Sequence, residues 1–493
     1  MACAASLLVI AITSGAGPGL DPDAIGYLGA ASSLAHHGSL RVPSSSWDAD
    51  DSTSALTTWP PGLSAAMAIP QSLGASPLSS ARIVLATAAF VSAAVLFLLL
   101  NSVTGPVAAI GGVVAVFVTP AIVGVHLSVL SEPLFLALLL LTLWAMVHRP
   151  RQPLVAGIPA AATTMVRYAG VCAPAAVVLW FFFTGRKQLR QRFADAGKAA
   201  LVPVIVFGAW LIRSTRVSDG QGGAELALNG HLGPTLREGA QTIADWLAPG
   251  IESPSLHALV AVCVAIAIAV IVMRAWRRIV AGSRADGPGS ALVLMRADLL
   301  LLACYVTILL SARLLVGDAI PFDFRLLAPA VLLAEVGIAV ALTFFLRGQA
   351  RPMRATVIVC LCLWVVGSIT VSSADAWEAV TSGDDFASPE WRASPTLEWV
   401  RTGGTGWTLF TNWPAAVYFH THRIARDIPQ SLDSADLRKF GAILRKRHGA
   451  FVAFTSYNTD YPPSDSIAHA LGLVQAGNFR DGKVWVSPAT EPR

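Results

Sequence analysis

The sequence predicts an all-α polytopic membrane protein with about eleven membrane-spanning helices, followed by a small C-terminal α/β domain. Two observations lead to this fold class. Of the 493 residues, 54% are hydrophobic and only 13% are charged, about half the roughly 25% charged residues of soluble domains. Apolar runs of about 20 residues, long enough to cross a bilayer as a helix, recur in residues 1–373. Residues 374–493 are charged, rich in Trp and free of long apolar runs.

Each apolar run is expected to form one span. Residues 1–20 carry no charge but contain three glycines and a proline, so we interpret them as a short first span. A cleaved signal peptide is the alternative, although the basic residues that begin such peptides are missing. The remaining runs are residues 79–101, 105–125, 132–148, 152–167, 169–185, 197–213, 255–273, 297–316, 326–346 and 354–373.

Charge alternates from loop to loop. The loops near residues 149–151, 186–198, 274–296 and 347–354 are basic, whereas those at 21–78, 214–254 and 317–325 are acidic. Beyond the first loop, the acidic residues are Asp219, Glu225, Glu238, Asp245, Glu252, Asp318 and Asp323. Because short basic loops stay in the cytoplasm, we expect a cytoplasmic amino terminus, with the acidic loops and residues 374–493 outside. The Ala-, Gly-, Pro- and Arg-rich composition suggests a bacterial plasma membrane.

The C-terminal domain is expected to mix strands and helices. Residues 408–421 are typical of a strand, a turn and a short helix, and Ser434 is placed to cap an amphipathic helix. Residues 449–457 and 472–488 are typical of strands, the latter a hairpin turning at residues 480–482. No cysteine lies in this domain, so no disulfide supports it. The predicted domains are therefore residues 1–373 and 374–493.

The first acidic loop holds the strongest candidates for catalysis. Residues 21–63 contain five carboxylates against the single cation Arg41. The carboxylates are Asp21, Asp23, Asp48, Asp50 and Asp51. A carboxylate just outside a span can act as a general base on a hydroxyl or amine. Alternatively, Asp21 or Asp23 caps a helix that runs from Ala24 through His37.

Three charged residues of later segments are also predicted at the outer face. Glu132 opens an apolar helix with Pro133 in its first turn, so it either serves function or interacts with the helix dipole. Arg167 and Arg325 are cations where cations are otherwise scarce. Since guanidinium groups bind phosphate oxygens well, a lipid phosphate is a fitting partner. Ion pairing with Glu132, Asp318 or Asp323 is the alternative.

No cofactor is predicted. The six cysteines lie in apolar stretches without the spacing of a zinc site. His36-His37 and His420-Thr421-His422 lack further ligands, so a divalent metal has no support. No Walker loop, GxGxxG, HExxH or GxSxG motif stands where it would be needed. The basic run at residues 186–192 is interpreted as a topological anchor, not a nucleic-acid surface.

Over about residues 1–345, the chain resembles the GT-C superfamily of integral-membrane glycosyltransferases. The similarity is to the bacterial branch related to protein mannosyltransferases and the aminoarabinose transferase of lipid A. Five elements carry it, in order: Asp23 with Tyr27 and the following Ala30, Ala31 and Leu34; Trp59-Pro60-Pro61-Gly62; Ser131-Glu132-Pro133-Leu134-Phe135; Arg167-Tyr168-Ala169-Gly170; and Arg325-Leu326-Leu327-Ala328-Pro329. The Asp-Glu pair of the aminoarabinose enzymes is absent, because Ala24 follows Asp23.

The resemblance implies hexosyl or pentosyl transfer from a polyprenyl-phosphate donor to an acceptor in the cell envelope, which is a lipid, a glycan or a protein. With a monophosphate donor, single displacement would invert the anomeric carbon. Asp23 would be the general base, with Asp21 as the competing candidate. Substrate would be bound by Tyr27, Glu132, Arg167, Tyr168, Asp323 and Arg325. In this set Glu132 would orient donor or acceptor, and the two arginines would hold the phosphate.

Two other classes remain as alternatives. A transporter or lipid-linked-sugar flippase would show inverted repeats and broken helices at the membrane midplane, whereas the polar residues here gather at one predicted face. A non-catalytic assembly or signalling protein acting through residues 374–493 would leave Asp23 replaceable. Loss of sugar transfer in the variant Asp23→Asn would distinguish a transferase from both alternatives.

Overall fold

The computed structural model describes residues 1–184, 188–218, 232–286, 289–316, 322–431, 433–455 and 461–488. Arg186, Lys187, Asp219, Glu225 and Asp318, used above to orient the chain, lie outside these residues. The chain forms two compact units, each considered by itself. The first comprises Met1–Gly15, Thr57–Leu63 and Ala81–Val380, and the second Ala16–Leu56, Ser64–Ser80 and Thr381–Arg493.

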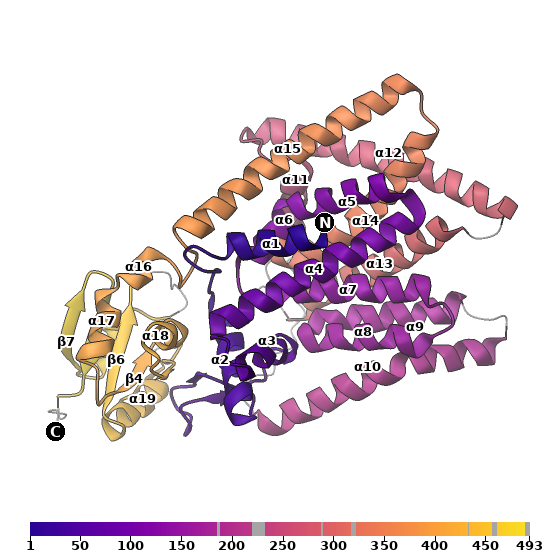
Figure 1. Ribbon diagram of the computed structural model, residues 1–493. Coiled ribbons are helices and arrows are strands. Elements are labelled where there is room, and N and C mark those ends of the chain that lie inside the picture. Colours follow the sequence, from indigo (N-terminus) through magenta and orange to yellow (C-terminus); the bar gives the residue numbers. More distant parts are fainter. Residues whose placement is uncertain are drawn as a thin grey trace. The chain divides into compact units, whose positions relative to one another are not determined.

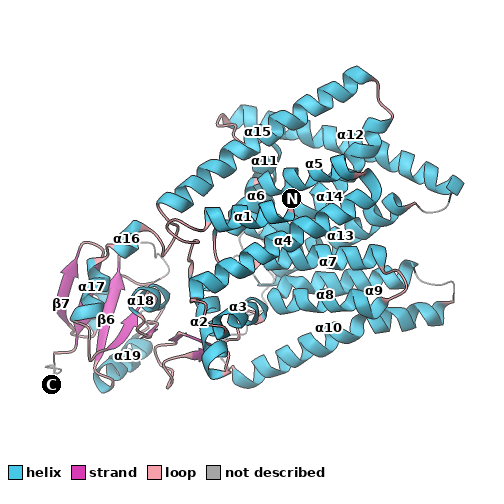
Figure 2. Ribbon diagram, viewed as in Figure 1, coloured by secondary structure: helices cyan, strands magenta, loops and turns pink. Residues whose placement is uncertain are grey.

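The first unit is a bundle of helices (Figures 1 and 2). Its elements are α1 (Ala2–Ile12), α4 (Pro77–Thr104), α5 (Pro106–Val118), α6 (Pro120–Leu127), α7 (Glu132–His148), α8 (Pro153–Val166), the 3-10 helix η1 (Tyr168–Val171), α9 (Cys172–Thr184), α10 (Leu189–Val217), α11 (Leu232–Leu247), α12 (Pro254–Asp286), α13 (Ser290–Val316), α14 (Phe324–Arg347) and α15 (Arg351–Thr381). Proline begins α5, α6 and α8 and follows Glu132 in α7, where its missing N–H loses no intrahelical bond.

Six helices of the described chain are long and apolar enough to cross a membrane, or up to seven if the bent pair α5–α6 is one span. The two members of that pair meet at 58°. Four of the predicted spans fall on shorter helices: α1, α7, α8 and the segment from η1 through α9. The 17 residues of α7 extend roughly 25 Å at 1.5 Å per residue, less than the roughly 30 Å hydrocarbon core. Eleven complete spans are therefore not confirmed.

Burial divides these helices into inner and outer ones. In α4, 61% of the apolar window is buried, against 6% in α12 and 11% in α15. Helix α12 exposes Leu259 and Ile266, and α15 exposes Leu363. A helix with apolar side chains all around is typical of a membrane-embedded segment. In the interior, α8 packs along α10 and α7 (Figure 1).

The second unit contains a six-stranded sheet and flanking helices (Figure 2). Its elements are α2 (Pro22–His37), β1 (Arg41–Val42), β2 (Ser44–Ser45), β3 (Ser54–Ala55), α3 (Gly62–Ser72, mostly in this unit), α16 (Pro389–Arg392), α17 (Pro395–Thr402), β4 (Thr408–Thr411), α18 (Pro414–Thr421), β5 (Ala425–Arg426), α19 (Ser434–Lys446), β6 (Gly449–Phe454), α20 (Ser464–Ala470), β7 (Val474–Phe479) and β8 (Gly482–Val486).

The sheet has the order β2-β5-β4-β6-β8-β7. The first four strands run parallel, and β8 and β7 add an antiparallel hairpin. Phe440 of α19 packs against Phe410 of β4 and Phe451 of β6. This aromatic core explains why so small a domain needs no disulfide.

The expected local elements of the C-terminal segment appear, with two corrections. The N-cap of α19 is Asp433, which accepts a hydrogen bond from the Ala435 N–H, rather than Ser434. Helix α15 continues through the predicted boundary at residue 373 as far as Thr381. Strand β2 was not expected: it comes from the first acidic loop yet pairs with β5, Ser44 opposite Ala425 and Ser45 opposite Arg426.

Candidate functional site

Asp21 is the N-cap of α2. Its Oδ1 accepts a hydrogen bond of 2.7 Å from the Ala24 N–H, and Pro22 occupies the first turn. The helix ends at His37, where Gly38 adopts the left-handed conformation with φ of 64° that glycine takes without strain. The capping alternative weighed from the sequence is therefore correct for Asp21.

Asp23 lies two residues after this cap, in the first turn of α2. It is half-buried, and Tyr27, one turn later, is only 3% exposed. A carboxylate near a helix N-terminus is stabilised in its charged form by the helix dipole. Asp21, Asp23 and Tyr27 all belong to the second unit.

The first unit brings three predicted site residues together around Glu132. The Glu132 side chain is fully buried at the start of α7. Its Oε1 lies 2.6 Å from Nη1 of Arg167 and 3.3 Å from Nε of Arg325. Ser131 joins the cluster: its Oγ donates to Glu132 Oε2 and accepts from Arg167 Nη1, at 3.3 Å and 2.9 Å. The sequence alternative of an Arg–Glu132 ion pair is thus realised by both arginines.

Burying a carboxylate is costly unless it is paired and hydrogen-bonded. The guanidinium groups of Arg167 and Arg325 supply this pairing for Glu132. We therefore describe Glu132 as the anchor that holds two arginines from distant parts of the chain beside each other.

The chain around Arg167 is built to fix its position. Helix α8 ends at Val166, and Arg167 is extended, with φ of −145° and ψ of 145°, before η1 begins. The Thr163 hydroxyl donates to the Gly170 carbonyl across 2.9 Å. A Cβ on Gly170 would overlap the Thr163 carbonyl oxygen, so only glycine allows this tight turn after α8.

Arg325 is fixed by the start of α14. Asp323 is the N-cap of that helix and accepts from the Leu326 N–H at 3.1 Å. Behind it, the Tyr305 hydroxyl of α13 donates to the Leu326 carbonyl at 2.6 Å, and Tyr305 is fully buried. Asp323 therefore has a structural role in α14, next to an arginine of the cluster.

Tyr168 follows Arg167 but makes different contacts. Its hydroxyl donates to the Thr57 carbonyl at 3.0 Å and accepts from Trp210 Nε1 of α10 at 3.3 Å. Its side chain is partly exposed. Tyr168 thus connects the turn after α8 to the segment that precedes Trp59.

Sequence reasoning missed several members of this region. Tyr305 and Trp210 stand alone in apolar helices, and no local pattern marks them. Ser131 was visible in the motif before Glu132, and a hydroxyl next to a buried acid is a usable signal. No group of three or more His, Cys, Asp or Glu suited to a metal occurs among the described residues.

Comparisons with known proteins identify the fold. No family model matches the chain, and no curated protein matches it. Among solved structures, ArnT from Cupriavidus metallidurans bound to undecaprenyl phosphate is similar at a TM-score of 0.58 and 11% identity, covering 100% of this chain and 98% of that one. The archaeal oligosaccharyltransferase AglB from Archaeoglobus fulgidus, in complex with an inhibitory peptide and a dolichol-phosphate, matches at 0.57 and 13%, covering 92% and 69%.

A third similar structure is the arabinofuranosyltransferase AftD from Mycobacteria, at a TM-score of 0.56 and 16% identity, covering 100% of this chain and 40% of that one. At these identities the likeness concerns the fold. ArnT, AglB and AftD are GT-C glycosyltransferases, and each matches over nearly the whole of this chain. The chain has the GT-C glycosyltransferase fold.

Proposed function

We propose that the protein is an inverting membrane glycosyltransferase that moves a hexosyl or pentosyl unit from a polyprenyl-phosphate donor to an extracytoplasmic acceptor. The observation that carries the proposal is the convergence of Arg167 and Arg325 on buried Glu132 in a chain of GT-C fold. The fold alone fits many acceptors, so the lipid, glycan or protein that receives the sugar stays open.

The two arginines are assigned to the donor phosphate. When the bond between the anomeric carbon and the phosphate oxygen breaks, negative charge grows on the departing polyprenyl phosphate. Fixed N–H donors and positive charge placed at that point stabilise the transition state more than the ground state. The contact of both arginines with one buried carboxylate, which holds them beside each other, supports this assignment. ArnT and AglB have been solved with a bound undecaprenyl phosphate and a dolichol-phosphate, respectively.

Asp23 is assigned as the general base. It takes the proton of the acceptor hydroxyl or amine while the acceptor atom bonds to the anomeric carbon, and the polyprenyl phosphate leaves from the opposite face. The configuration of that carbon is thereby inverted. Asp21, whose Oδ1 accepts from the Ala24 N–H and caps α2, is the competing candidate. The alternation of charged loops supports a cytoplasmic amino terminus and a reaction outside, and the Ala-, Gly-, Pro- and Arg-rich composition supports a bacterial plasma membrane.

The test is sugar transfer from a panel of radiolabelled polyprenyl-phosphate sugars in membranes containing the full chain. Arg325→Gln removes the charge and leaves a shorter polar side chain, and we expect roughly 100-fold slower transfer. Arg354→Gln is the matched control, since Arg354 lies on the surface and donates to the Gln349 and Arg347 carbonyls.

Equal rates of sugar transfer by wild type and Arg325→Gln would show that the arginines do not stabilise the donor phosphate in the reaction. If wild type transfers nothing yet moves lipid-linked sugar across vesicles, the protein is a flippase instead.

A further inference from the structure

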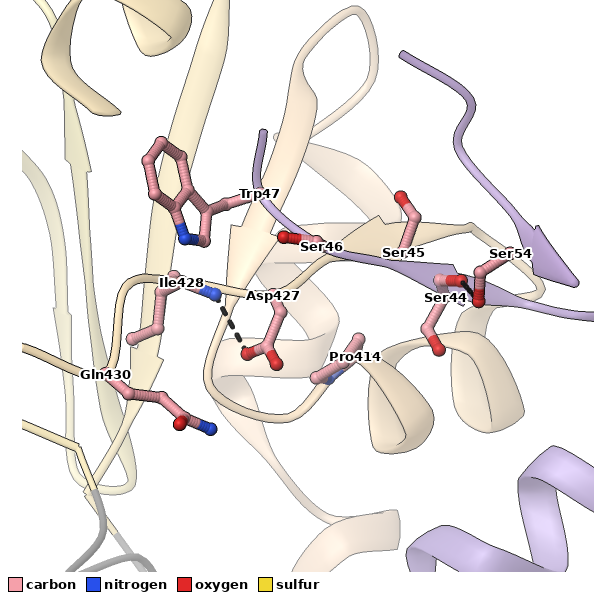
Figure 3. A pocket seen from close by; sticks show the side chains of 9 residues that line it. All are labelled: Ser44, Ser45, Ser46, Trp47, Ser54, Pro414, Asp427, Ile428 and Gln430. Carbon is pink, nitrogen blue, oxygen red and sulfur yellow. Dashed lines mark hydrogen bonds between the residues drawn. The ribbon is translucent and has the colours of Figure 1, made fainter. Parts of the chain in front are cut away.

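The second unit contains a polar pocket of about 390 Å³, within the range of about 300–1,000 Å³ typical of small-molecule sites. One wall is residues 44–47 and Ser54 of the first acidic loop, and the other is Pro414, Asp427, Ile428 and Gln430 of the C-terminal segment. In Figure 3, Trp47 and Gln430 stand to one side of the Asp427 carboxylate, and Ser44 and Ser54 to the other.

The pocket lies where parallel strands end. Trp47 follows β2, Asp427 follows β5, and Pro414 comes after β4, three neighbours in the parallel part of the sheet. The carboxyl ends of parallel strands are the usual place for ligands in α/β folds, because the loops there diverge. The Asp427 N–H also donates to the Ser45 carbonyl at 3.0 Å, which fixes the two walls against each other.

Buried Arg426 holds the loop wall in place. It is 5% exposed and donates to the Ala49 and Asp50 carbonyls at 2.6 Å and 3.0 Å, and to Ser45 Oγ at 3.3 Å. Lys439 adds an ion pair to Asp48 at 2.8 Å and lies 5.2 Å from the centre of the Trp47 ring. Because the buried guanidinium group donates to several backbone carbonyls of the loop, it fixes the shape of this wall of the pocket.

Three polar groups in the pocket are available to a ligand. The Asp427 Oδ1 accepts from Tyr461 and the Ile428 N–H. Within the described part of the chain, no donor contacts its Oδ2, and neither Ser44 Oγ nor the Gln430 amide has a partner. Together with the Trp47 ring, this lining offers hydrogen-bond acceptors, donors and a flat apolar surface.

We propose that this pocket is a saccharide-binding site for a sugar unit that carries no negative charge. A pyranose or furanose ring presents neighbouring hydroxyls, which match the carboxylate, amide and serine hydroxyl, and C–H groups, which match an aromatic face. Asp427 is the one charged side chain in the described lining, so it favours neutral or amino sugars and repels sugar acids and phosphates. That the bound sugar belongs to the acceptor would rest on the proposed function; the binding itself does not.

Burial raises the pKa of the Asp427 carboxyl, and hydrogen bonds from Tyr461 and the Ile428 N–H oppose this rise. Binding is therefore measured above neutral pH, where the carboxylate form is favoured. The full chain in nanodiscs is titrated with neutral pentose and hexose oligosaccharides, with glucosamine oligomers, and with oligogalacturonate as the anionic probe. Saturation-transfer NMR detects the contact, and calorimetry gives the Kd.

We expect a neutral or amino oligosaccharide to bind with a Kd of about 1 mM or tighter. Gln430→Ala and Asp427→Asn should each weaken it about tenfold. Gln430 is exposed, and the amide of Asp427→Asn keeps an oxygen that can accept from Tyr461, so unchanged melting temperatures are expected. Asp465→Asn is the control, because Asp465 pairs with Lys483 outside the pocket.

Three results would overturn the proposal. The first is that no neutral or amino probe binds. The second is that wild type and both pocket variants bind with equal Kd values. The third is that oligogalacturonate binds as tightly as the neutral and amino probes, or more tightly. Sugar transfer is not part of this readout. Saccharide binding without sugar transfer would therefore reject the proposed enzymatic function but support the saccharide-binding site. Sugar transfer without saccharide binding would support the enzymatic function but reject the binding site.

Discussion

Nη1 of Arg167 lies 2.6 Å from Oε1 of Glu132, although the two residues lie in different parts of the bundle. Arg167 follows α8, and Glu132 begins α7. The carboxylate is fully buried and the guanidinium side chain is 17% exposed. A pair in which the anion is hidden and the cation reaches the surface is suited to present positive charge to an anionic ligand.

Removing the anchor should destabilise the bundle. Glu132→Gln leaves two guanidinium groups side by side without their counter-charge, and breaking a buried ion pair costs about 3–5 kcal/mol. We expect a clear fall in the melting temperature of the detergent-solubilised chain. Glu398→Gln breaks the exposed pair with Arg401 and should cost at most about 1 kcal/mol. Similar melting temperatures for the two variants would show that Glu132 does not anchor the arginines.

The turn after α8 should tolerate glycine alone at position 170. In Gly170→Ala the new Cβ would overlap the Thr163 carbonyl oxygen, so the turn must shift and move Arg167 with it. Small displacements of a charge-stabilising group are costly, and we expect about 10- to 100-fold slower sugar transfer. Gly197→Ala, in α10, meets no atom within 4 Å and should transfer like wild type. Full activity of Gly170→Ala would mean that the position of Arg167 is unimportant.

The attachment of the first acidic loop to the sheet should depend on Arg426. Lysine keeps the charge but cannot donate to several carbonyls from one planar group. Arg426→Lys should therefore increase hydrogen exchange and protease cleavage at residues 44–51. Arg438→Lys, at an exposed position of α19, is the control. Unchanged protection in Arg426→Lys would show that strand pairing alone holds this loop.

The second unit should lose stability in acid through His420. Burial first, and then Arg401 and Arg392, lower the pKa of His420 below 6.5, while its hydrogen bond to the Phe386 carbonyl at 2.9 Å opposes this. The unfolded chain therefore binds more protons than the folded one between the lowered pKa and 6.5, so stability falls as the pH drops through this window. Phe386 also donates its N–H to the Leu20 carbonyl, next to Asp21.

Melting temperature measured against pH tests this account of His420. His420→Gln can still donate to the carbonyl but cannot take up a proton, so its melting temperature should fall less than that of wild type below about pH 6.5. His469→Gln, at an exposed position, should follow wild type. If the melting temperatures of wild type and His420→Gln fall equally as the pH is lowered, the prediction is contradicted.

Local signals in the sequence predicted much of the fold. Glu132 with Pro133 in the first turn marked the start of α7, and the predicted helix from Ala24 through His37 with an aspartate cap matches α2 within a few residues. The order of short motifs indicated GT-C, and the structural comparisons confirm that fold. The predicted number of spans is not confirmed, because an apolar run fixes composition but not helix length: α7 and α8 are apolar but short.

The rest depended on contacts between distant residues. Ser44 and Ala425 pair although 381 positions separate them, and two-residue strands carry no periodicity to reveal this. The role of Arg426 was hidden for the same reason, because its partners are backbone carbonyls of another segment. The sequence suggested that Arg167, Arg325 and Glu132 share a face. Only the packed helices show that one carboxylate oxygen contacts both arginines.

The central claim is that Asp23 is the base of a sugar transfer, and the most direct measurement compares Asp23→Asn with Asp51→Asn in the radiolabelled transfer assay. Asparagine keeps the shape of Asp23 and removes its basicity, whereas Asp51 is a largely exposed carboxylate of the same loop, paired with Arg41. At equal protein levels, we predict at least roughly 100-fold slower transfer by Asp23→Asn and near wild-type transfer by Asp51→Asn. Undiminished transfer by Asp23→Asn would contradict the account.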